Sequence, residues 1–133
     1  MKLTTALRTA IANEILSTIT SGTVSDPTIE IYTGAIPALG DPVSDTLLAT
    51  LTMTTTAGTV TDGVITMDAI TSDTSADATG TAGWARVLDR DGAAAIHITV
   101  ADDGSGDLNL NSVNVVAGTP VAITAFTITI GGA

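Results

Sequence analysis

Residues 72–100 read SDTSADATGTAGWARVLDRDGAAAIHITV, and the predicted fold is built outward from this segment. The segment holds the only Trp and the only His of the chain, with two of its four basic residues. We predict a β-hairpin with strands near residues 84–89 and 94–100. The turn is placed at Asp91-Gly92, because a two-residue type I′ turn needs positive φ at both central positions and these residue types tolerate it. The core face of the return strand is predicted to carry Ala94, Ile96, Ile98 and Val100. On the outgoing strand the sequence leaves open whether Trp84 or its neighbours face the core.

The composition favours one mainly β domain, residues 1–133. This length is usual for a single domain, and the 26 threonines, with many Val and Ile, suit pleated strands better than helices. There is no cysteine, which excludes a disulfide framework and thiolate metal sites. A net charge of −10 with four basic residues offers no patch for phosphates, so we expect neither nucleic-acid binding nor attraction to an anionic membrane.

An amphipathic helix is predicted within residues 1–22, from Thr4 or Thr5 to about Thr20. Thr4 can supply the N-cap oxygen, and Gly22 sits where a left-handed residue ends a helix. Two interpretations of its apolar stripe stay open: packing on the chain's own sheet, or docking on a partner. The residues of the stripe that are candidates for an interaction are Leu7, Ile11, Ile15 and Ile19.

Residues 28–130 are predicted to form an antiparallel β core of seven or eight short strands. Alternating apolar runs mark strands at 28–33, 47–54, 64–70, 107–111, 113–116 and 121–130. A second hairpin turn is predicted at Asp62-Gly63, a surface loop at 34–44, and a β-bulge near Thr124-Ala125, where the alternation changes parity. The spacing of these strands indicates an antiparallel β-sandwich or small barrel. We expect its core to include Ile29, Ile31, Leu51, Ile96, Ile98, Phe126 and Ile128.

Residues that could carry chemistry are few. His97 is the only histidine, so a histidine cluster for zinc cannot form, and an ordinary side chain on a sheet face is favoured over a member of a serine triad. The acidic loop at residues 102–107 could offer Asp102, Asp103 and Asp107 to calcium, although the loop departs from the EF-hand pattern. We therefore expect a non-enzymatic protein without cofactor, stable without metal, with those three aspartates as weak metal candidates.

Four segments carry a resemblance to a known family. They are LTTALRTAIANEI at residues 3–15, EIYTG at 30–34, LLATLTM at 47–53 and TSDTSADATGTAGWARVLDRDG at 71–92. With these segments the chain resembles a group of small structural proteins encoded in tailed bacteriophage and prophage genomes. The resemblance spans nearly the whole chain and transfers no catalytic motif.

The resemblance implies a virion protein made in the host cytoplasm and present in many copies. The implied role is a head decoration or cement protein, which binds the major capsid protein at the capsid surface as a homo-oligomer. The alternative is a tail, neck or fibre component with a receptor- or glycan-binding role. Sugar-binding sites usually present exposed aromatic faces, and this chain has only Tyr32, Trp84 and Phe126, which favours the structural role.

Overall fold

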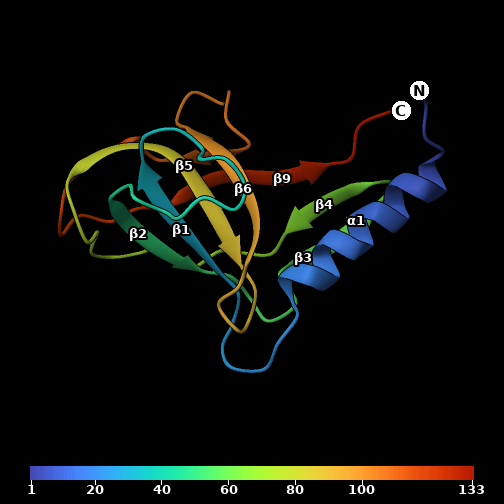
Figure 1. Ribbon diagram of the computed structural model, residues 1–133, viewed down its shortest axis with the longest axis horizontal. Helices are drawn as coiled ribbons and strands as arrows, with labels where there is room; N and C mark the ends of the chain where they lie inside the picture. The colour runs from blue at the N-terminus through green and yellow to red at the C-terminus, as the bar shows by residue number, and fades with distance from the viewer.

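One N-terminal helix and nine strands make up the fold in the computed structural model, which describes residues 1–133 (Figure 1). The elements are α1 Thr5–Ile19, β1 Thr28–Thr33, β2 Leu47–Thr52, β3 Gly58–Thr61, β4 Val64–Met67, β5 Gly80–Leu88, β6 Ala94–Ala101, β7 Leu108–Leu110, β8 Asn114–Val115 and β9 Ile123–Thr129. The helix begins and ends where the sequence predicts. Thr4 is the N-cap and its Oγ1 accepts the Leu7 N–H at 3.2 Å, while Gly22 has a φ of 106°.

The strands form a single mixed sheet that curls into a half-barrel, with α1 packed mainly on β3 and β4 (Figure 1). Its order is β2-β1-β5-β6-β7-β9-β4-β3, and the short β8 pairs with β5. The prediction of a mainly β fold with one N-terminal helix is confirmed. The finer prediction of a two-sheet sandwich or a closed barrel is not confirmed.

The prediction of a wholly antiparallel sheet is wrong at one pairing, because β6 and β7 run parallel. A parallel neighbour usually needs a connection of a dozen or more residues, yet residues 102–107 make this one. Gly106 allows the tight path: a Cβ there would lie 2.7 Å from the Ala101 nitrogen and 2.8 Å from the Leu108 oxygen. The acidic loop thus returns the chain in the same direction beside β6.

The two predicted hairpin turns have different outcomes. Between β3 and β4, Asp62 and Gly63 have φ values of 51° and 80°, as a type I′ turn requires. Between β5 and β6 the prediction of a two-residue turn at Asp91-Gly92 is wrong, since only Gly92 has positive φ, at 86°. The Asp89 carboxylate accepts the N–H groups of both Asp91 and Ala93 at 2.9 Å, and this holds a three-residue loop instead.

The aliphatic core lies on one face of the sheet and under α1. Of the seven predicted core residues, five are buried: Ile29, Ile31, Leu51, Ile98 and Phe126. Ile96 and Ile128 are only partly buried, because β6 and β9 diverge where these residues lie. The predicted bulge in the last strand is confirmed, since Asn109 pairs with Ala125 and Leu110 with Ile123, which leaves Thr124 as the extra residue.

Candidate functional site

The opposite face of the sheet carries a cluster of aromatic and charged side chains, which we call the outer cluster. Strand alternation creates it, because β1 and β5 turn Ile29, Ile31 and Val87 to the aliphatic core and their neighbours outward. Register then brings the outward residues together: Glu30 lies opposite Arg86, Tyr32 opposite Trp84, and Arg86 opposite His97. The cluster comprises Glu30, Tyr32, Asp45, Trp84, Arg86 and His97.

Stacked rings form the apolar part of the outer cluster. The rings of Tyr32 and Trp84 are stacked with centroids 4.7 Å apart, and the His97 ring lies tilted at 5.1 Å from Trp84. Trp84 is fully buried, although it lies outside the main aliphatic core. It is buried because residues 34–46 cross this face (Figure 1), and Asp45 in that loop accepts the indole N–H at 2.9 Å.

The loop that covers Trp84 begins with a close approach to β5. A Cβ on Gly83 would lie 1.8 Å from the Gly34 carbonyl oxygen, so the loop can start here only because residue 83 has no side chain. At the other end of the loop, Thr33 N–H donates to the Thr46 carbonyl at 3.1 Å. The loop is therefore anchored at both ends over the outer cluster.

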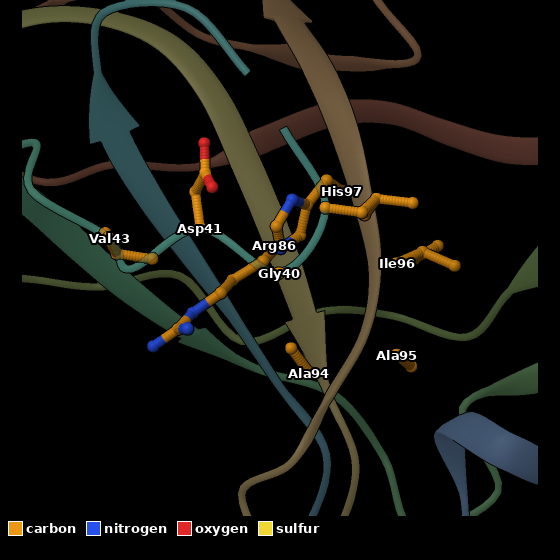
Figure 2. A pocket seen from close by; sticks show the side chains of 9 residues that line it. Gly40, Asp41, Val43, Arg86, Ala94, Ala95, Ile96 and His97 are labelled. Atoms are coloured by element: carbon orange, nitrogen blue, oxygen red, sulfur yellow. The ribbon is translucent and has the colours of Figure 1, made fainter. Parts of the chain in front are cut away.

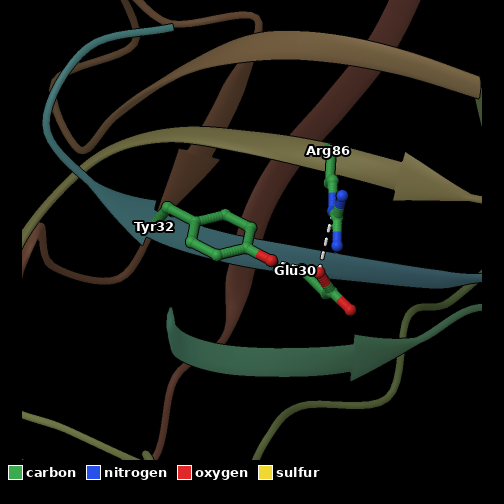
Figure 3. A network of polar contacts seen from close by, with 3 residues as sticks. All are labelled: Glu30, Tyr32 and Arg86. Carbon is green, nitrogen blue, oxygen red and sulfur yellow. Dashed lines mark hydrogen bonds and ion pairs between the residues drawn. The ribbon is translucent and has the colours of Figure 1, made fainter. Parts of the chain in front are cut away.

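A charge network adjoins the stacked rings (Figure 3). Arg86 Nε donates to Glu30 Oε2 at 2.9 Å, and the Tyr32 hydroxyl donates to the same oxygen. Burial, and then the hydrogen bond and the negative charge of Glu30, raise the pKa of Tyr32 from 10.0 to about 12. Because the Arg86–Glu30 pair is partly exposed, we expect it to contribute less than about 1 kcal/mol to stability.

The raised pKa of Tyr32 predicts a loss of stability in alkaline solution. The folded protein holds the phenolic proton more tightly than the unfolded chain, so this contribution is complete below pH 10.0 and is lost as the pH rises towards about 12. Tyr32 is the only tyrosine, so the absorbance of its phenolate measures the pKa directly. Tyr32→Phe should remove this part of the alkaline loss, as measured by urea unfolding across that pH range. A titration midpoint near 10.0 would contradict the buried hydrogen bond.

A cavity of about 280 Å³ opens beside the outer cluster, between the covering loop and β6. Its charged and polar lining comes from Asp41, Arg86 and His97, with Leu39 and Val43 as apolar neighbours (Figure 2). The His97 Nδ1 atom is buried and makes no hydrogen bond. No carboxylate therefore orients the ring in the way a catalytic triad requires, and the lining is suited to hydrogen bonding with a small polar group.

The three carboxylates of the acidic loop at residues 102–107 accept hydrogen bonds from the protein itself. Asp102 accepts the Val113 N–H at 2.9 Å, and Asp107 accepts both the N–H and the hydroxyl of Thr99 at 3.1 and 3.0 Å. Asp103 accepts the N–H and the hydroxyl of Ser105 at 3.0 and 2.6 Å, and these hydrogen bonds lower its pKa. The three aspartates thus accept hydrogen bonds from three different segments, at Val113, Ser105 and Thr99, and no group of three His, Cys, Asp or Glu side chains has a metal-binding arrangement.

The four candidate residues of the helix stripe separate into two pairs. Ile19 is fully buried in the core and Ile15 packs against it. Leu7 and Ile11 remain 48% and 36% exposed. The side chains of α1 that pack against the sheet are mainly those of Ala12, Leu16 and Ile19. The first half of the predicted stripe, Leu7 and Ile11, therefore lies beside the contact between helix and sheet.

Sequence reasoning did not find the outer cluster as a unit. The alternation in β1 does predict that Glu30 and Tyr32 lie on the opposite face from Ile29 and Ile31, and this signal could have indicated part of the cluster. The pairing of β1 with β5 brings Arg86 and Trp84 to them, and those strands are separated by three others in the chain, β2, β3 and β4.

The fold and its outer cluster define a mainly β protein with one helix and an anchored loop over one sheet face. No protein-family model, curated protein or solved structure matches this chain. Its helix is too short and too polar to cross a membrane.

Proposed function

We propose that this chain is a non-enzymatic structural protein of a tailed bacteriophage virion. Its proposed role is that of a head decoration or cement protein, attached to the major capsid protein as a homo-oligomer. The resemblance of residues 3–15, 30–34, 47–53 and 71–92 supports the class. The exposure of Leu7 and Ile11 on α1 is the structural observation that carries the proposed association, because large apolar side chains on one helix face favour contact with another protein surface.

The two outer edges of the sheet add support for self-association. The β2 edge is closed: Thr71 exchanges backbone hydrogen bonds with Thr52, and the Asp73 carboxylate accepts the Thr50 N–H at 2.9 Å. The β3 edge has no strand or bridge beyond it. Because Thr61 and Val64 flank a two-residue turn, alternation directs the N–H and C=O of Val60 outward. An open edge of this kind is a template for pairing with an identical edge.

Many weak contacts can hold an oligomer of such subunits on a repeating shell. Each subunit carries a formal net charge of −10, so like charges oppose close approach of subunits and each contact is expected to be weak. Simultaneous engagement of several copies raises the effective concentration at the next site. The oligomer can therefore stay attached where a single subunit would dissociate.

The alternative function is a receptor- or glycan-binding role in a tail, neck or fibre. One observation favours it, namely the cavity lined by Asp41, Arg86 and His97, whose donors and acceptors suit a polar ligand such as a sugar. The aromatic rings next to this cavity are buried under residues 34–46 and do not offer the exposed stacking face usual in sugar sites.

The position and number of copies in the particle test the proposal. Virions produced by the genome that encodes this chain are purified and separated into heads and tails, and the protein is quantified and located with labelled antibody. We expect many copies on heads. Confinement to the tail tip would favour the alternative, and absence from the particle would contradict both roles.

A further inference from the structure

The half-barrel contains an internal split between β6 and β9. The short β7 joins these strands at one end only: it pairs with Val100 and Ala101 of β6, and with residues 123–126 of β9. Beyond those residues β6 pairs only with β5, and β9 only with β4. The two strands diverge from β7 towards α1 (Figure 1).

Two adjoining cavities, of about 240 and 360 Å³, occupy this split and form a groove. They share Asp107, Thr127 and Thr129. The smaller one is lined by three consecutive residues from each strand, 96–98 of β6 and 127–129 of β9. Successive side chains of a strand point to opposite faces, so a cavity that touches three in a row meets the edge of the strand and its backbone.

Hydrogen-bond alternation shows which backbone groups face the groove. The Thr99 N–H donates to Asp107 at 3.1 Å, away from β5, so His97, two residues earlier, has the same orientation. On β9 the Ile130 N–H donates to the Gly63 carbonyl at 2.9 Å, towards β4. Thr129 and Thr127 therefore direct their N–H and C=O groups into the groove.

We propose that this groove binds one extended segment of a partner protein, which adds a β-strand between β6 and β9. Main-chain hydrogen bonds to His97, Thr127 and Thr129 would provide the register, in the manner of strand addition. The partly exposed Ile96 and Ile128 would pack against apolar side chains at alternate positions of the segment.

The charges around the groove define the kind of segment. Asp107 lies at the β7 end, and Glu14 of α1 lines a further cavity that shares Ile96 at the other end. No Lys or Arg lines any of these cavities. A segment with Lys or Arg on either side of an apolar, alternating stretch is complementary. The chain's own C-terminus is an unsuitable occupant, because the Gly132 carbonyl already accepts the Leu3 N–H.

The groove gives the proposed virion protein a surface for binding its partner. Only the identity of the partner rests on the proposed function. The test uses a synthetic peptide of about seven residues, in which valine and threonine alternate and lysine stands at both ends. An extended peptide of this length reaches along the unpaired edges of β6 and β9. We expect saturable binding, with the amides of His97, Thr127 and Thr129 protected from hydrogen exchange. Replacing the terminal lysines with glutamate should weaken binding at low salt. Protection elsewhere, or no binding, would overturn the proposal.

Thr129→Pro tests the edge itself. The Thr129 N–H points into the groove, so replacing Thr129 with proline removes no hydrogen bond within the protein. Peptide binding should weaken about tenfold or more, because this donor is lost and the proline ring occupies the path of the added strand. Val60→Pro is the matched control: it alters the open β3 edge in the same way and should keep peptide binding while reducing self-association. Equal binding by folded Thr129→Pro and the unchanged protein would refute the groove. Peptide binding is measured without particles. The groove proposal can therefore be refuted while the virion role holds, and the virion role can be refuted while peptide binding holds.

Discussion

Trp84→Ala should lower the free energy of unfolding by about 3–5 kcal/mol. The side chain is fully buried, so its removal leaves a cavity between the sheet and residues 34–46. The stacked Tyr32 ring and the Asp45 carboxylate also lose their partner. Small domains are stable by about 5–15 kcal/mol in total, so this single change should remove a large share. Urea unfolding followed by circular dichroism measures the loss.

Trp84→Phe separates packing from hydrogen bonding. A phenylalanine ring can still stack on Tyr32 but has no N–H for Asp45, so the loss should be smaller than for alanine. Asp45→Ala, which leaves the indole N–H without an acceptor, should cost about 1–3 kcal/mol. An alanine variant at position 84 that is destabilised by less than about 1 kcal/mol would show that the anchored loop contributes little to the fold.

Local signals in the sequence predicted the elements well. The Thr4 cap fixed the start of α1, and Asp62-Gly63 formed the expected turn because both residues adopt positive φ. Asp91-Gly92 has the same residue types and gave a different loop. The difference lies at Asp89, whose carboxylate accepts two backbone N–H groups of the loop and so competes with the two-residue turn.

The same local signals could not predict how strands distant in the chain pair with one another. Alternation in β6 and β7 says which face each residue occupies, and it is equally satisfied by parallel or antiparallel neighbours. The direction of β7 depends on contacts made by residues 102–107, such as the one between Asp107 and Thr99 of β6. The sequence identified these aspartates as weak ion candidates, whereas in the structure their carboxylates hold the loop that makes the parallel pairing possible.

The outer cluster was predictable only in part for a related reason. The sequence left open which way Trp84 points, since it expected one buried face per strand. In the structure both faces of β5 are covered, by the aliphatic core on one side and by residues 34–46 on the other. Trp84 is thus buried without joining the aliphatic core.

The helix stripe predicts two opposite results for the same kind of substitution. Ile19→Asp should unfold the protein, because a carboxylate would replace a fully buried side chain and lower the free energy of unfolding by more than about 4 kcal/mol. Leu7→Asp combined with Ile11→Asp should change stability far less, since both side chains are already well exposed. The same double variant should lose self-association and attachment to particles.

Sedimentation of the folded double variant, together with binding to particles that lack the protein, decides whether α1 is a contact surface. Asn13→Asp combined with Ser17→Asp is the matched control, because it adds the same two negative charges at exposed positions of α1 away from Leu7 and Ile11, and it should associate normally. Equal loss in this control would assign the effect to the added negative charge on a subunit that already carries −10. Normal association of the double variant would instead remove the helix from the interface and leave the β3 edge, which Val60→Pro tests, as the remaining route to an oligomer.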